Sequence, residues 1–405
     1  MRAPIYLDHA ATTPVDPRVV AAMLPWLGEG FGNASSRSHA FGRRASAAIE
    51  RARGQVAALV RCDASEIVFT SGATESINLA LKGAASHQRD RGRHLVTLAT
   101  EHRATLDTLD AVAADGFDVT RVPVGAGGLV DPTRFTAALR PDTTVASVMA
   151  VNNETGVVQD IAVLGAICRA HGVVFHVDAA QATGKVALDL ASLPVDLMSL
   201  SAHKTYGPKG VGALFVRRRP RARIDAQMHG GGQERGLRAG TLATHQIVGM
   251  GEALRIAGLD MDAENARIGA LRDRLWRDLS AIGGVHRNGD PDHCVPQLLN
   301  VAFTGIAAEE LMLAMEEIAV STGSACGSVS AEPSHVLRAL GVSDEVAHGA
   351  LRFSLGRGTT ADEIAYTAAL VKRKVAALRG AAARARPRRR GVRGGVTMEA
   401  QSLPD

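Results

Sequence analysis

The hydrophobic positions of this chain form short apolar runs that alternate with longer amphipathic stretches. Short apolar runs bounded by turn residues indicate buried strands, and apolar residues spaced three and four apart indicate helices. The pattern predicts strands at 67–70, 94–98, 119–122, 144–151, 173–177, 197–200 and 211–216, with helices at 71–83, 105–115, 132–139 and 161–171 between them. Such alternation predicts an α/β fold with a mostly parallel sheet.

Further elements flank this region on both sides. Residues 1–17 are expected to be extended, and a long helical region at 247–279 leads toward the C-terminal part. The remaining predicted elements are helices at 18–27, 41–60, 308–318, 335–340 and 362–378 and strands at 296–303, 320–321 and 352–355. Because 405 residues exceed one simple core, we expect two domains. We predict a large domain at 15–260, a small domain made of 1–14 and 261–378, and a separate tail at 379–405.

Composition and charge narrow the class of protein. No apolar stretch approaches the ~18 residues of a membrane span, and the N-terminus has no apolar signal core, so we expect a cytoplasmic protein without a membrane partner. Residues 379–405 contain seven arginines and two acidic residues, which accounts for the whole net charge of +5. This low-complexity tail is predicted to be disordered, and we expect nucleic acid to bind at most weakly through it.

Residues with polar side chains or free backbone N–H groups follow five of the predicted strands. In an open α/β sheet the carboxyl ends of the strands form the ligand crevice, so these residues are expected to meet at one edge. They are Gly72, Ala73 and Thr74 after the first strand, then His102, Asn153, Asp178 with Gln181, and Ser201 with His203 and Lys204. A carboxylate after one strand and a lysine after the next suit pyridoxal phosphate, which needs a Schiff-base lysine and an acidic partner.

Each of these residues also has a simpler interpretation. Gly72 to Thr74 open a helix whose free N–H groups can hold a phosphate, but they could equally form an ordinary N-cap. Asp178 could cap a helix instead of holding a pyridinium nitrogen. His102 could stack on a cofactor ring and move protons, although a single histidine is more often structural. Lys185 and Lys209 compete with Lys204 for the imine, and Lys204 is preferred because it lies nearest a strand end.

Two further residues stand out. Cys326 lies in a segment of small residues, 321–334, which predicts a mobile loop and an accessible thiol; an incidental surface cysteine is the alternative. None of the four cysteines forms a CxxC motif, which argues against a metal centre or a disulfide scaffold. Arg352 is an isolated arginine in an apolar strand and could hold a substrate carboxylate or form a structural salt bridge.

Taken together, the motifs resemble those of cysteine desulfurases of the NifS/IscS type, which are fold-type-I pyridoxal-phosphate enzymes of the class V aminotransferase family. They span residues 5–360 in the family's order and read YLDHAATTP, FTSGATES, TEH, VNNETG, HVDAAQ, SAHKTYGPKG, GGGQERGLRAGT, STGSAC and EPSHVLRALG. The resemblance implies a large domain with a mostly parallel seven-stranded sheet and a smaller α+β C-terminal domain. It also implies a homodimer.

The resemblance assigns a role to each candidate residue. Lys204 would carry pyridoxal 5′-phosphate, His102 would stack on its ring, and Cys326 would take the sulfur of L-cysteine as a persulfide while L-alanine leaves. Cofactor contacts would come from Ala73, Thr74, Asn153, Asp178, Gln181, Ser201 and His203, with Thr241 reaching the phosphate from the other subunit. Asn153 and Arg352 would bind the substrate carboxylate.

The implied partners are sulfur acceptors. They include an iron–sulfur scaffold protein and a possible tRNA-thiolation relay, and no metal site of the chain's own is implied beyond a cluster that Cys326 would share transiently with the scaffold. The arginine-rich tail departs from the family's C-terminus, which puts the scaffold contact in doubt. Two alternatives stay open: a selenocysteine lyase or another β-eliminating enzyme, and a protein that binds nucleic acid or an acidic partner through its tail.

Overall fold

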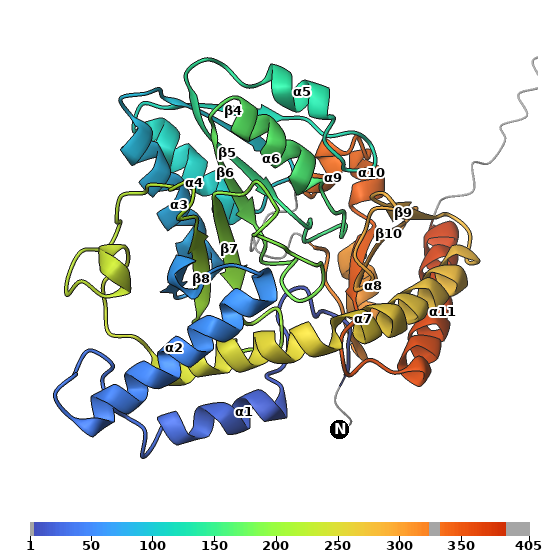
Figure 1. The fold of residues 1–405 in the computed structure, drawn as a ribbon. Coiled ribbons are helices and arrows are strands. Elements are labelled where there is room, and N and C mark those ends of the chain that lie inside the picture. Colours follow the sequence, from blue (N-terminus) through green and yellow to red (C-terminus); the bar gives the residue numbers. More distant parts are fainter. Residues whose placement is uncertain (1–3, 324–332, 386–405) are drawn as a thin grey trace, which may run out of the picture.

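A seven-stranded sheet forms the centre of the larger part of the molecule (Figure 1). The computed structural model describes residues 4–323 and 333–385. Across the sheet the strands are β2 (Ile67–Thr70), β8 (Gly212–Val216), β7 (Leu197–Ser201), β6 (Val174–Asp178), β5 (Thr143–Met149), β3 (His94–Leu98) and β4 (Asp118–Val122). The strands from β7 to β4 pair in parallel, whereas β8 is antiparallel to both of its neighbours. The predicted α/β fold with a mostly parallel sheet is confirmed.

Helices cover both faces of this sheet because successive strand residues point to opposite sides. Val68 packs in one apolar cluster with α3 (Ala73–Gln88) and α4 (Arg103–Ala114). Ile67 and Phe69 point to the opposite cluster, which holds the other covering helices. These are α2 (Ala40–Val60), α5 (Pro132–Ala137), α6 (Ile161–Ala170) and the first part of α7 (Thr244–Ser280), while α1 (Pro17–Met23) packs outside on α7.

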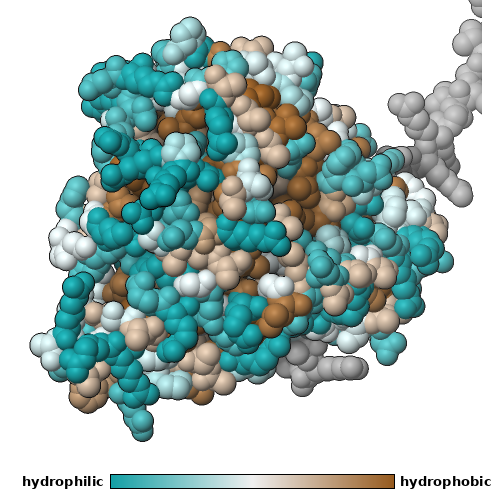
Figure 2. All heavy atoms as spheres, in the orientation of Figure 1, coloured by the Kyte–Doolittle hydropathy of each residue, from teal (hydrophilic) through white to brown (hydrophobic). Residues whose placement is uncertain are grey.

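A smaller antiparallel sheet forms the second part of the molecule, in the order β12-β10-β9. Its apolar cluster includes the second part of α7, so this one helix packs in both parts. The elements here are β9 (Val285–Asn288), β10 (Leu298–Phe303), β12 (Ala350–Ser354), α8 (Ala308–Ala314), α9 (His335–Ala339), α10 (Asp344–Ala347) and α11 (Ala361–Ala385). Hydrophilic residues cover much of the face in Figure 2, with hydrophobic residues in separate groups between them.

The first residues of the chain pair with a segment near residue 318, and this pairing shortens one predicted helix. Residues 1–17 were expected to be extended, and within them β1 (Ile5–Tyr6) is a strand that pairs in parallel with β11 (Ile318–Ala319). The helix expected at 308–318 ends at Ala314, because residues 318–319 are held in the ladder with the N-terminal strand. Periodicity within one segment cannot report a partner more than three hundred residues away.

Two segments singled out in the sequence lie outside the residues that the structure describes. Residues 324–332, which include Cys326, and residues 386–405 of the arginine-rich tail lie outside the described part. Among the helices within 4–323 and 333–385, none is long and apolar enough to cross a membrane.

Candidate active site

A cavity of about 500 Å³ lies at the carboxyl ends of the parallel strands. Its wall contains all of the predicted site residues except Thr241 and Cys326: Ala73, Thr74, His102, Asn153, Asp178, Gln181, Ser201, His203, Lys204 and Arg352. Sequence reasoning placed these groups at one edge because parallel strands end on the same side of a sheet. The structure brings them together around one cavity.

One end of the cavity is suited to an anion. Ala73 and Thr74 begin α3, a helix of 16 residues, and Gly72 before them provides no side-chain cap. The first backbone N–H groups of a helix lack partners within the helix and carry its positive dipole end. Ser201 Oγ is buried in the same wall and has no hydrogen-bond partner among the described residues. A phosphate here would accept from both kinds of donor.

Burial favours the neutral form of the two histidines in the wall. His102 lies just before α4, and its Nδ1 accepts from the Ala104 N–H at 3.0 Å, so a neutral ring carries its proton on Nε2. Burial lowers the pKa of His102, and the nearby Lys204 charge lowers it further. Burial, with the charge of Lys204, also lowers the pKa of His203 to about 4. Both rings can therefore act as neutral donors or acceptors at pH 7.

Two carboxyl groups lie buried near His102. Asp178 is the last residue of β6, and its Oδ1 accepts from the Ala180 N–H at 2.9 Å. The residues that follow form turns, so the helix cap considered from the sequence is not present. The position of Asp178 in the cavity wall leaves it able to face a ligand as well. Glu101 Oε1 accepts from the Met149 N–H at 2.9 Å. Burial raises the pKa of Glu101 well above its usual range, and the charge of Asp178 adds to this.

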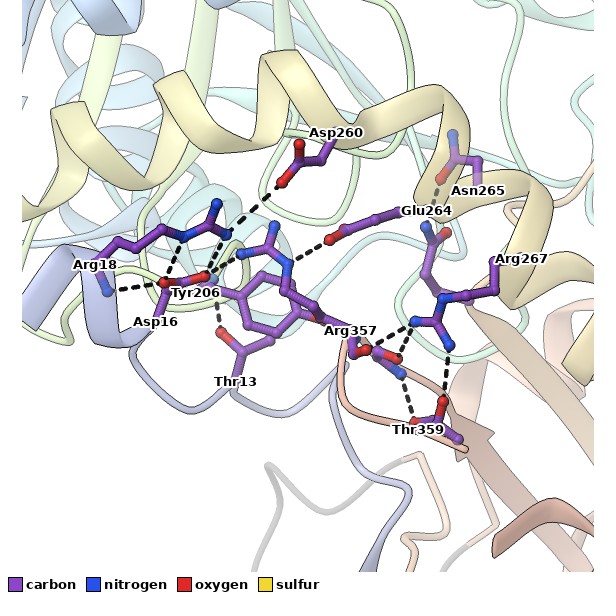
Figure 3. A network of polar contacts seen from close by, with 12 residues as sticks. Thr13, Asp16, Arg18, Tyr206, Asp260, Glu264, Asn265, Arg267, Arg357 and Thr359 are labelled. Atoms are coloured by element: carbon purple, nitrogen blue, oxygen red, sulfur yellow. Dashed lines mark hydrogen bonds and ion pairs between the residues drawn. The ribbon is translucent and has the colours of Figure 1, made fainter. Parts of the chain in front are cut away.

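The chain after Lys204 is held in a turn by contacts from distant segments (Figure 3). Tyr206 has a φ of 60°, a left-handed conformation that a residue with a side chain rarely adopts. Its N–H donates to Thr13 Oγ1 at 2.8 Å, and its hydroxyl accepts from the Arg357 N–H at 2.5 Å. The Arg357 guanidinium lies over the Tyr206 ring, 4.3 Å from its centroid, and pairs with Asp16. These contacts fix the backbone two residues beyond the candidate Schiff-base lysine.

Arg352 combines a structural contact with an open donor. Its Nη2 pairs with Asp8 Oδ1 at 2.7 Å, and its Nη1 donates to the Asn153 carbonyl at 2.8 Å. The salt bridge considered from the sequence is therefore present. The Arg352 Nε is buried and has no partner among the described residues, and both Arg352 and Asn153 line the cavity. The unpaired N–H is a donor that a bound carboxylate can use.

The three lysines considered from the sequence differ in position. Lys204 and Lys209 line the main cavity, whereas Lys185 lines a cavity of about 20 Å³ whose wall also includes Lys204. Sequence reasoning missed that Lys185 Nζ donates to Gln181 Oε1 at 2.9 Å. The spacing of four residues between the two was the available signal.

Thr241 is exposed on the protein surface and does not contribute to the cavity of its own chain. The segment that carries it is fastened nearby, because the Arg238 guanidinium pairs with Glu75 in the first turn of α3 at 2.7 Å. Cys326 lies outside the described residues, so the structure assigns it no position. The described residues contain no group of three or more histidine, cysteine, aspartate or glutamate side chains that could hold a metal ion.

Comparison with models of protein families identifies the family of this chain. The profile of aminotransferase class-V matches residues 5–366. The chain belongs to this family. It is 62% identical to the cysteine desulfurase IscS of Methylococcus capsulatus, with 94% of each chain covered, and 56% identical to that of Pectobacterium atrosepticum, again with 94% covered. The resemblance predicted from the motifs is confirmed.

Solved structures agree with this assignment. A structure titled "NifS-like protein" superposes with a TM-score of 0.86 at 36% identity, covering 93% of this chain and all of that one. Another, titled "SspA in complex with cysteine", gives a TM-score of 0.77 at 38% identity, covering 87% of this chain and 98% of that one.

Proposed function

We propose that this chain is a pyridoxal-phosphate-dependent cysteine desulfurase. It converts L-cysteine to L-alanine and leaves the sulfur as a persulfide on Cys326. The observation that carries the proposal is the convergence of ten of the twelve predicted site residues on one cavity, in a chain 62% identical to a relative named cysteine desulfurase IscS.

The cavity fits pyridoxal phosphate. Ala73, Thr74, Ser201 and His203 would hold the phosphate, and the unpartnered Ser201 Oγ supports that role. The remaining contacts would be Asp178 to the pyridine nitrogen, Gln181 to the ring hydroxyl, His102 against the ring face and Lys204 as the covalent attachment, with Asn153 close by. When bound, the cofactor withdraws electrons from the substrate's α-carbon and so acidifies its proton.

The protein groups would then divide the remaining work. Arg352 and Asn153 orient the substrate carboxylate, and the free Nε of Arg352 supplies a charged donor for it. Lys204 moves the α-proton, and the neutral His102 can carry a proton at its Nε2 edge. The carbon–sulfur bond of L-cysteine breaks while a sulfur–sulfur bond forms on Cys326. The reaction thus turns one thiol and one cysteine into one persulfide and one alanine.

A homodimer would complete the phosphate site. Thr241 is exposed and does not line the cavity of its own chain, which supports a role toward a second copy. The side chains of Leu24, Leu27, Phe31 and Phe41 are large, apolar and exposed, which is typical of an interface. We keep the domain division at 15–260 and 261–378, with residues 1–14 in the small domain.

We further propose that the enzyme is cytoplasmic and passes its persulfide sulfur to acceptors. These would be an iron–sulfur scaffold protein and tRNA-thiolation relays. We assign the chain no resident metal ion.

Substitution of the nucleophile tests the function. Cys326→Ser is expected to keep the cofactor's visible absorbance but to lose sulfide release from L-cysteine with a reductant present. Cys294→Ser, at a cysteine outside the cavity, is the matched control and should keep both. Sulfide release that persists in Cys326→Ser would favour simple elimination and exclude the persulfide route.

A further inference from the structure

The Gln181 side chain is held at both of its polar atoms. Its Nε2 donates to the Ala10 carbonyl at 2.8 Å, and its Oε1 accepts from Lys185 Nζ at 2.9 Å. Only 2% of the residue is exposed. A buried amide with two such partners has one orientation.

The chemistry of the two partners sets that orientation. A backbone carbonyl can only accept, so the Ala10 oxygen selects the NH₂ end of the Gln181 amide. A 180° flip would turn Gln181 Oε1 against the Ala10 oxygen and leave Lys185 facing an NH₂ group. In the observed orientation one N–H of Nε2 has no partner among the described residues, and Gln181 forms part of the cavity wall. The amide can therefore donate one hydrogen bond to a ligand.

The backbone of Lys185 is held by a side chain from α7. The Lys185 carbonyl accepts from Asn265 Nδ2 at 2.8 Å, and Asn265 Oδ1 accepts from Gln297 Nε2 at 2.6 Å. Gln181 is the only side chain in the described ranges that is hydrogen-bonded to Lys185 Nζ. Burial, together with the charges of Lys204 and Arg352, lowers the pKa of Lys185 to about 7. Burying an amino group costs free energy, so we infer that Lys185 contributes to the adjacent site.

We propose that Lys185 is a positioning residue that orients and polarises the Gln181 amide, so that its remaining N–H binds an oxygen anion of the ligand. This rests on the proposed function, in which that oxygen is the ring hydroxyl of pyridoxal phosphate. A donor at Oε1 draws electron density from the amide and strengthens its N–H as a donor, as in other hydrogen-bonded chains. Lys185 does not line the main cavity, so it would act on the ligand only through Gln181.

Two ligands that differ by this one oxygen test the proposal. Cofactor-free protein is titrated with pyridoxal 5′-phosphate and with 3-deoxypyridoxal 5′-phosphate, which lacks the ring hydroxyl but keeps the aldehyde and the phosphate. The wild type is expected to prefer the hydroxylated ligand by about tenfold or more, as for a hydrogen bond to a charged group. Lys185→Met is expected to lose most of this preference and to bind the deoxy ligand as the wild type does.

Two further variants complete the design. Gln181→Glu removes the N–H itself, so it should lose the preference as well, and adding Lys185→Met to it should change nothing more. Lys372→Met, at an exposed lysine of α11, is the matched control and should keep the wild-type ratio.

The possible failures are distinguishable. If the wild type binds neither ligand, the proposed function is wrong, and this inference is wrong with it. If the wild type prefers the hydroxylated ligand and Lys185→Met keeps that preference, only the role of Lys185 is overturned. If Lys185→Met weakens the binding of both ligands equally, Lys185 only supports the structure of the cavity, and its proposed role is likewise overturned.

Discussion

The ion pair between Arg53 and Glu234 provides a stringent test of the energetic reasoning. Two bonds of 2.7 and 2.8 Å join the guanidinium of Arg53 to the carboxylate of Glu234. The two side chains are 4% and 1% exposed, and Glu234 Oε2 also accepts from the Phe69 N–H at 2.7 Å. Arg53 donates further to the Ile67 carbonyl at 2.9 Å. The ion pair thus connects the segment around Glu234, which leads to Thr241, with β2.

Removing one partner leaves the other charge buried with only part of its compensation, because Arg53 Nε still pairs with the exposed Glu50 at 3.2 Å and Glu234 keeps the Phe69 N–H. For pairs this deeply buried, breaking one side costs about 3–5 kcal/mol of the free energy of unfolding. We therefore expect Glu234→Gln and Arg53→Met each to lower that free energy by about 3 kcal/mol or more. The double variant leaves no unpaired charge, so it should cost at least about 2 kcal/mol less than the sum of the single variants.

Urea unfolding of the cofactor-free protein, followed by circular dichroism, measures these differences. Arg140→Met is the matched control, because Arg140 pairs with Asp142 on the surface with side chains 43% and 45% exposed. Exposed pairs contribute about 1 kcal/mol or less. The reasoning fails if the buried single variants cost no more than this control, or if their effects simply add.

Three further results are expected. Borohydride reduction of the cofactor-loaded protein, followed by peptide mapping, should label Lys204, and a label on Lys185 or Lys209 would overturn the assignment. Arg357→Met removes two partly buried ion pairs and a cation–π contact, so urea titration should show a loss of about 1–3 kcal/mol, and a loss under about 0.5 kcal/mol would contradict the network in Figure 3. Burial lowers the pKa of His176 to about 3, whereas a histidine in the unfolded chain has a pKa of about 6.5. Below about pH 6.5 the unfolded state therefore binds more protons than the folded state, and the free energy of unfolding decreases as the pH falls. Between pH 7.5 and 5 the wild type should lose about 2 kcal/mol of its free energy of unfolding through His176, and His176→Gln should not show this loss. Equal acid sensitivity of the two proteins would refute the prediction.

The sequence predicted the central sheet and most of the site for one physical reason. Buried parallel strands are continuous apolar runs, and the polar residues at their ends must gather at one edge, as Asp178 and Lys204 do. Contacts between distant segments carry no such local signal. The pairing of Arg352 with Asp8 spans 344 residues, and the choice between substrate binding and a structural salt bridge could not be made before the fold was known.

The position of the first residues has a consequence for how the protein is made. Ile5 pairs with Ile318, Asp8 with Arg352, and Thr13 contacts the carbonyl of His203 beside Lys204. These first residues are synthesised early, yet two of their partners, Ile318 and Arg352, follow more than 300 residues later. Loop closure over such separations slows folding, and the segment must stay unpaired until then. The large sheet can form during translation, but the substrate end of the cavity is completed only after Arg352 has been synthesised.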